Sequence, residues 1–143
     1  MTITEFLRMT VFIKTYHSGD VQSVRPRIEC NDGFSMSVQA SAYHYSDPRE
    51  NGLFSVYNSV EIGFPSEEEY LILEYAEEPN KPMTTCYGYV PVTLVDEVLV
   101  KHGGMKDETM LPIIAKFWEE VDMRYASLED YKHQLETIRK YGP

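Results

Sequence analysis

The clearest pattern in the chain is a strict alternation of apolar and polar residues over residues 34 to 40. The apolar positions are Phe34, Met36, Val38 and Ala40, and the polar positions between them are Ser35, Ser37 and Gln39. A period of two places all apolar side chains on one face of a β-strand. The pattern therefore predicts a strand with one buried face and one polar face.

Three further segments read as strands and complete an antiparallel meander. Residues 24 to 30 precede Asn31-Asp32-Gly33, a turn sequence whose residues tolerate positive φ, so 24–30 and 34–40 predict a β-hairpin. Residues 53 to 64 predict a third strand, interrupted near Asn58. Residues 84 to 90, rich in Thr, Tyr and Val, predict a fourth. The inward side chains expected in the third strand are Phe54, Val56, Val60 and Ile62.

Helical spacing of apolar residues dominates the rest of the chain. Residues 3 to 16 predict a helix with Thr2 or Thr4 as its cap and Gly19 as its stop, although their β-branched content leaves a strand open. Residues 92 to 101 predict a helix that ends at His102-Gly103-Gly104. The last 40 residues predict helices, one bearing an apolar stripe and one opening at Ser127. The stripe consists of Ile113, Ile114, Phe117, Trp118 and Val121.

An acidic segment after the third strand has the form of a helix start. Ser66 is the expected N-cap, Glu69 lies three residues later and completes a capping box, and acidic residues complement the positive end of the helix dipole. The sequence therefore predicts a short acidic helix over about 66–77.

Together these elements predict an α+β fold, with a β-meander of about four strands packed against helices and a helical C-terminal region. No repeat or linker divides the chain, so residues 1–143 are expected to form a single domain, with an α+β core at 1–104 and a helical extension at 105–143. The apolar runs are far shorter than the roughly 20 residues that span a bilayer. The N-terminus lacks the pattern of a secretion signal, so a cytoplasmic protein is expected.

The distribution of charge along the chain is more informative about binding partners than the overall composition. The formal net charge is −10, and residues 61–100 contain nine acidic residues against one basic residue, Lys81. Such a segment repels nucleic acid and attracts a basic surface, so direct DNA or RNA binding is not expected. The simpler interpretation is a solvated acidic face that keeps the protein soluble.

No motif indicates catalysis or metal binding. The four histidines and the two cysteines, Cys30 and Cys86, lack the close spacing of zinc ligands, and both cysteines are expected to be free core or half-buried thiols. The chain contains no nucleophile elbow and no phosphate-binding glycine loop. His102 is interpreted as a helix C-terminal residue. We therefore expect a protein that is not an enzyme and needs no cofactor or metal.

Tyrosines within the acidic segment suggest a protein-binding patch. Tyrosine combines a large contact area with a hydroxyl group and is enriched at interfaces, although sheets also use it for packing. An anionic rim around such anchors suits the capture of a basic partner. The expected partner-binding residues are Glu67, Glu68, Glu69, Tyr70, Glu74, Tyr75, Glu77 and Glu78.

An alternative function is the binding or sequestering of a small nucleotide signal. Aromatic rings and arginines suit a nucleotide, and such a pocket would use Tyr43, Tyr45, Tyr57, Arg25 and Arg27. An accessory protein with another partner is a further alternative.

Several sequence stretches also carry a resemblance to a known group of proteins. They are residues 31–40, residues 48–52, Gly63-Phe64-Pro65-Ser66-Glu67, and Tyr87-Gly88-Tyr89-Val90-Pro91-Val92 through His102-Gly103-Gly104. With them, residues 24 to 104 resemble small proteins of phages, prophages and conjugative elements of gut Firmicutes. The resemblance implies a bacterial host cell. By analogy it implies an inhibitor of the anti-CRISPR type, which occupies the nucleic-acid or PAM-reading surface of an RNA-guided nuclease.

Overall fold

A four-stranded antiparallel sheet forms the centre of the protein. The computed structural model describes residues 1–14, 22–50 and 56–125. The sheet order is β3 (Ile28–Glu29), β4 (Ser35–Gln39), β5 (Ser59–Gly63) and β6 (Cys86–Pro91). Each strand pairs with its neighbour in sequence, so the predicted meander and the hairpin at Asn31-Asp32-Gly33 are confirmed.

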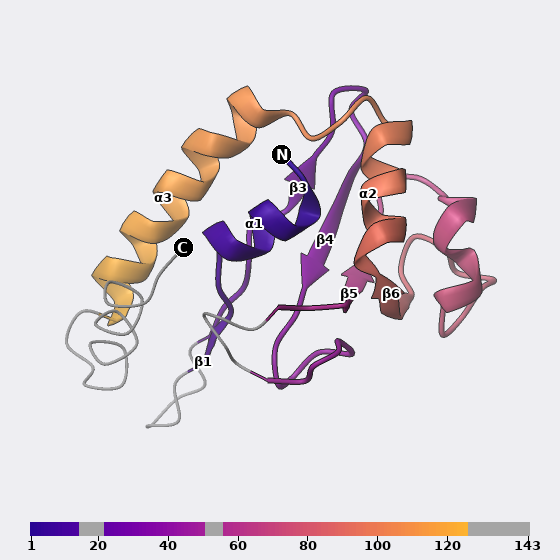
Figure 1. The fold of residues 1–143 in the computed structure, drawn as a ribbon, viewed down its shortest axis with the longest axis horizontal. Helices are drawn as coiled ribbons and strands as arrows, with labels where there is room; N and C mark the ends of the chain where they lie inside the picture. Colours follow the sequence, from indigo (N-terminus) through magenta and orange to yellow (C-terminus); the bar gives the residue numbers. More distant parts are fainter. Residues whose placement is uncertain (15–21, 51–55, 126–143) are drawn as a thin grey trace.

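Helices cover one face of this sheet. In Figure 1, α1 (Ile3–Met9) and α2 (Val92–Lys101) lie across the sheet, α3 (Asp107–Tyr125) lies to the left, and the 3-10 helix η1 (Tyr70–Tyr75) lies to the right. The protein therefore has the predicted α+β fold. The strands β1 (Ile13–Lys14) and β2 (Gln22–Ser23) pair with each other in a separate two-stranded antiparallel ribbon.

The main core lies between the sheet and these helices. The strands contribute Met36, Val38, Val60, Ile62 and Tyr87, all fully buried. The helices contribute Ile3 and Phe6 of α1, Val95, Val98 and Leu99 of α2, and Met110 and Ile114 of α3. Part of the predicted C-terminal extension thus packs into the same core as the sheet.

The first helix is shorter than its sequence pattern predicts. Its start is as expected, since Thr2 and Glu5 form a capping box. It ends at Met9, and Thr10 is extended. Beyond this point the β-branched residues Val11 and Ile13 pack in a second small core with Val121 of α3, so tertiary packing favours the strand alternative there. The predicted stop at Gly19 lies outside the described residues.

Two strands also differ from their predicted bounds. The predicted strand 24–30 is reduced to β3, because Arg25 is hydrogen bonded to Gln39 through its backbone N–H and carbonyl instead of forming a strand ladder. The same contacts bury Gln39, which had been expected on the polar face. In the third strand, β5 begins after the predicted interruption at Asn58. Val56 is 62% exposed rather than inward, and Phe54 lies outside the described residues.

The two later helices follow their patterns. Helix α2 has the predicted bounds, and the amide of Gly104 donates to the carbonyl of Leu99 at 2.7 Å to close its C-terminus. Helix α3 buries Ile114 and Val121 of the predicted stripe, while the helix expected from Ser127 lies outside the described residues. Across the described ranges, no helix combines the length and the apolar character needed to cross a membrane.

Candidate functional site

The acidic segment is anchored by a buried carboxylate rather than by a helix cap at Ser66. Glu69 is fully buried, and its Oε2 accepts hydrogen bonds from the amide of Leu71 at 3.0 Å and from Nζ of Lys101 at 2.9 Å. Glu69 is therefore itself the N-cap of η1. The short helix predicted over about 66–77 forms only as the 3-10 helix η1 over Tyr70–Tyr75. Ser66 is not its N-cap, because its Oγ accepts a hydrogen bond from the amide of Ser35.

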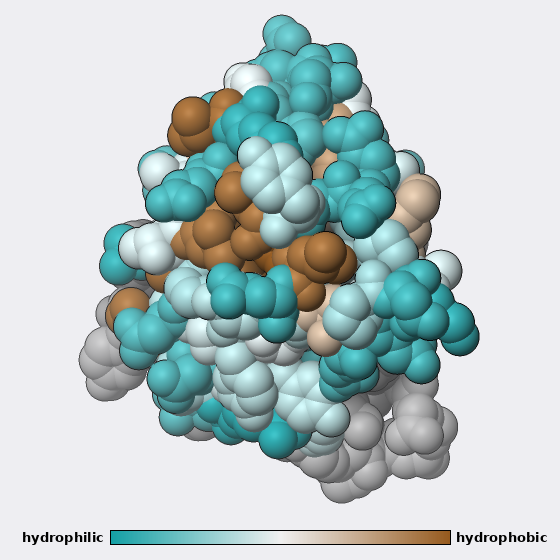
Figure 2. Space-filling view, turned by 90° about the vertical axis from the view of Figure 1, so that its right-hand side faces the viewer, coloured by the Kyte–Doolittle hydropathy of each residue, from teal (hydrophilic) through white to brown (hydrophobic). Residues whose placement is uncertain are grey.

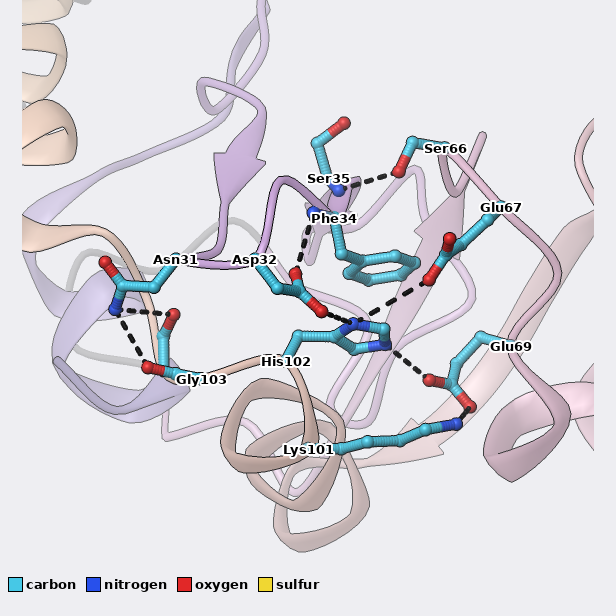
Figure 3. A network of polar contacts seen from close by, with 11 residues as sticks. Asn31, Asp32, Phe34, Ser35, Ser66, Glu67, Glu69, Lys101, His102 and Gly103 are labelled. Carbon is cyan, nitrogen blue, oxygen red and sulfur yellow. Dashed lines mark hydrogen bonds and ion pairs between the residues drawn. The ribbon is translucent and has the colours of Figure 1, made fainter.

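His102 completes this anchor from the C-terminus of α2. Its Nε2 lies 2.7 Å from Oε1 of Glu69, and its Nδ1 lies 2.6 Å from Oδ2 of Asp32, in the hairpin turn (Figure 3). The imidazole stacks on Phe34 with 4.0 Å between the ring centroids. His102 is buried, so it does more than interact with the helix dipole.

The geometry requires His102 to be protonated. Each ring nitrogen faces a carboxylate oxygen, and only the imidazolium has two N–H donors. Burial by itself lowers the pKa of His102, but hydrogen bonds to Glu69 and Asp32 outweigh burial and hold that pKa above its ordinary value. Burial likewise raises the pKa of Glu69, yet hydrogen bonds from Leu71, Lys101 and His102 bring it below its ordinary value.

The network ties together three segments that are distant in sequence. They are the hairpin turn, the stretch before η1 and the end of α2 (Figure 3). Nδ2 of Asn31 adds a hydrogen bond of 2.8 Å to the carbonyl of Gly103. The acidic segment is consequently fixed at its base and not a free loop.

Most of the predicted partner-binding residues lie on the surface above this anchor. The exposed carboxylates are Glu67, Glu68, Glu74, Glu77 and Glu78. Tyr70 is 69% exposed, and Nζ of Lys101 lies 3.9 Å from its ring centroid, a cation–π contact. Tyr75 is half-buried and packs against the core. Glu69 is a correction, because a fully buried carboxylate paired with Lys101 and His102 cannot reach a partner.

The side of the molecule that carries α2, η1 and β6 combines apolar and hydrophilic residues. Figure 2 shows apolar side chains gathered in the middle of this face with hydrophilic side chains around them. Val100 of α2 is 77% exposed, and Leu71 of η1 is half-buried. An apolar centre with a polar rim is the usual anatomy of a protein interface.

The residues proposed for a nucleotide pocket serve mainly in packing. Arg25 is buried, and its guanidinium donates to Oγ1 of Thr10 and to the carbonyl of Ala40. Burial lowers the pKa of Arg25 to about 10. Tyr57 is also buried and donates to the carbonyl of Glu50. Neither side chain is available to stack on or to bind a nucleotide.

The other three residues, Tyr43, Tyr45 and Arg27, lie on the surface and contact neighbouring residues of the same protein. Tyr43 contacts the ring of Phe12 with 5.7 Å between centroids, and Tyr45 lies 5.8 Å from Tyr89. Arg27 is exposed, and its guanidinium donates to the Ser35 hydroxyl and to the carbonyl of Phe64.

The two cysteines and the Ser41–His44 pair lie in buried or half-buried surroundings. Burial raises the pKa of Cys30 to about 11, and burial together with a hydrogen bond to Glu61 raises that of Cys86 to about 12, so both thiols are protonated at neutral pH. Oγ of Ser41 lies 2.6 Å from Nδ1 of His44, but Ser41 is 1% exposed and closed to a substrate. In the described ranges, no group of three or more potential ligands could hold a metal ion.

Sequence reasoning missed the partners of Glu69. Lys101 and His102 lie 32 and 33 positions from Glu69, and Asp32, the other partner of His102, lies 70 positions from that histidine. No local spacing links these residues. Comparisons of the chain with protein-family models, with curated proteins and with solved structures found no match. The resemblance to proteins of phages and mobile elements stays a prediction from the sequence.

Proposed function

We propose that the protein is a non-enzymatic inhibitor that binds a basic surface of a partner protein through the acidic segment 66–78. The observation that carries this proposal is the set of five exposed carboxylates beside the exposed ring of Tyr70, on a segment with no basic residue. A surface of this kind attracts a cationic partner before contact and supplies an aromatic anchor after it.

The buried anchor supports the same proposal. Glu69 and His102 fix the base of the segment, so little conformational freedom remains to be lost when a partner docks. Preorganisation of this kind raises affinity without adding contacts.

The partner class that fits best is a nucleic-acid-binding enzyme, and the first candidate is an RNA-guided nuclease. Such a nuclease grips phosphates and PAM bases with Lys and Arg side chains. Carboxylates presented on a rigid surface would occupy those side chains and compete with DNA. The inhibitor would then act in the cytoplasm of a bacterial host cell.

The direct test is a pull-down of the tagged protein with a purified type II CRISPR nuclease, with and without guide RNA, followed by DNA-cleavage assays over a salt series. We expect stable association, loss of cleavage, and weakening of both as salt screens the charges. Failure to associate at low salt with the nuclease in either form would overturn the assignment of this partner class.

A further inference from the structure

The face of the sheet opposite the helices contains a hollow whose floor follows from strand register. Ser37 of β4 pairs with Gly63 of β5, and Gly63 pairs with Cys86 of β6. Three small residues thus lie side by side across three strands. A Cβ built on Gly63 meets no atom within 4 Å, so the space above this row is open.

Longer side chains surround this floor and make it a cavity of about 320 Å³. Gln39 and Glu61, which face each other across β4 and β5, lie two residues along from the small row. His44 and Phe64 also line the cavity. Its size suits the end of one long side chain or a small ligand.

The described lining residues give this cavity a net negative charge. Burial lowers the pKa of His44, and although the charge of Glu61 acts in the opposite direction, Arg25 and Arg49 reinforce the lowering, so the ring is neutral at neutral pH. Cys86 is also neutral, because burial and Glu61 raise the pKa of its thiol. Glu61, whose Oε1 accepts a hydrogen bond from the amide of Tyr45 at 3.2 Å, is then the one carboxylate among the described residues that line the space.

Phe64 adds an aromatic ring to the cavity, and the backbone of this residue has an unusual conformation. Its φ is +49°, in the left-handed region that costs a non-glycine residue about 1 kcal/mol or more. The guanidinium of Arg27 hydrogen bonds to the Phe64 carbonyl and fixes this conformation. The Phe64 side chain remains 61% exposed at the cavity instead of packing into the core.

We propose that this cavity binds a guanidinium group, which pairs with the carboxylate of Glu61 and packs against the ring of Phe64. Carboxylates and aromatic faces are the two protein groups that attract such cations. Arg27 and Arg49 lie nearby, but Arg27 is bonded to the backbone of Phe64, and Arg49 lies over the ring of Tyr45 at 5.4 Å. This site is distinct from segment 66–78 and does not depend on the proposed inhibitor function.

The test is an NMR titration of the ¹⁵N-labelled protein with N-acetyl-arginine amide, and with N-acetyl-citrulline amide as the neutral isostere. Saturable shifts at the amides of Gly63 and Cys86 with the arginine compound, and binding at least tenfold weaker for citrulline, are expected. Absence of saturable shifts, or equal binding of the two compounds, would overturn the proposal.

Two variants keep the test specific to the cavity. Gly63→Val fills the floor of the hollow, and because the backbone there is extended the fold should tolerate it. Glu61→Gln removes the charge while keeping the size of the side chain. Both should lose arginine binding, whereas Glu29→Gln, an exposed carboxylate on β3, should keep it. Unchanged binding by Gly63→Val and Glu61→Gln would contradict the site.

The source of the cation is distinguished by a second pair of probes. Free L-arginine and the capped tripeptide Ala-Arg-Ala carry the same guanidinium but differ in the backbone around it. Tighter binding of the tripeptide would assign the site to a side chain of a protein partner, and tighter binding of free arginine would assign it to a small molecule. Binding of neither would refute the cation site.

Discussion

The contact between Glu69 and His102 shows how one residue can have a local and a tertiary role that the sequence does not distinguish. The spacing from Ser66 to Glu69 is that of a capping box, and the acidic run around it favours a helix start. In the fold, the Glu69 carboxylate is used by Lys101 and His102 instead. Once the carboxylate is buried, loss of either partner leaves its charge uncompensated, which costs more than loss of a capping bond exposed to water.

Replacing His102 should be among the most destabilising changes in this region. His102→Gln leaves the fully buried Glu69 and the nearby Asp32 without their imidazolium partner. The expected loss is about 3 kcal/mol of unfolding free energy, measured by urea denaturation. Glu67→Gln is the control, since Glu67 lies 3.8 Å from Nδ1 of His102 with its side chain 63% exposed and should cost less than about 0.5 kcal/mol. Equal losses for the two variants would contradict the network.

The same pair should make stability depend on pH in a defined direction. The pKa of His102 is raised in the folded protein, so its contribution is complete below its ordinary pKa of 6.5 and is lost as pH rises through the folded value. The pKa of Glu69 is lowered, so its contribution is present above its ordinary pKa of 4.5 and is lost as pH falls through the folded value.

The stability difference between the wild-type protein and His102→Gln should therefore shrink on going from about pH 5.5 to about pH 9. Urea denaturation of both proteins at a series of pH values measures this difference. A difference that stays constant over that range would show that His102 carries no charge in the fold.

At the scale of elements, the sequence was most informative where local pattern and tertiary packing agree. The alternation over residues 34–40 and the Asn31-Asp32-Gly33 turn predict β4 and its hairpin, and α2 has its predicted bounds because its apolar stripe and glycine stop coincide. The prediction failed where distant partners decide the structure. Residues 10–13 leave the helix because Val11 and Ile13 pack against α3, and η1 forms because Glu69 turns inward.

Two glycines, one in the hairpin turn and one in β5, allow a matched comparison of backbone strain. Gly33 has a φ of +96°, whereas Gly63 lies in a regular strand, and a Cβ at either position meets no atom within 4 Å. Gly33→Ala should therefore cost about 1 to 2 kcal/mol through backbone strain alone. Gly63→Ala should be neutral or stabilise the protein by up to about 1 kcal/mol. Thermal and urea denaturation measure both, and equal effects would contradict the turn geometry.

At the scale of the whole molecule, the sequence concentrates negative charge in one segment, and the fold decides which of its carboxylates are exposed. Residues 61–100 account for −8 of the net charge of −10. The fold removes Glu69 from the surface and leaves the remaining carboxylates of segment 66–78 exposed around Tyr70. Sequence could predict the acidic patch but not which of its members is buried, because burial depends on the C-terminus of α2.

Two double variants distinguish the effect of the acidic surface at residues 66–78 from the effect of net charge alone. Glu67→Lys with Glu68→Lys reverses two exposed charges beside the anchor, and Glu119→Lys with Glu120→Lys makes the same change of net charge on exposed positions of α3. Circular dichroism and denaturation should show that both variants fold, because all four side chains are exposed.

The most direct test of the proposed function is the association rate of these two variants and the wild-type protein with the type II nuclease at low salt. If segment 66–78 is the docking surface, the Glu67 and Glu68 variant should associate at least about tenfold more slowly and lose inhibition, while the α3 variant stays close to wild type. Equal rates and retained inhibition for the Glu67 and Glu68 variant would contradict the account.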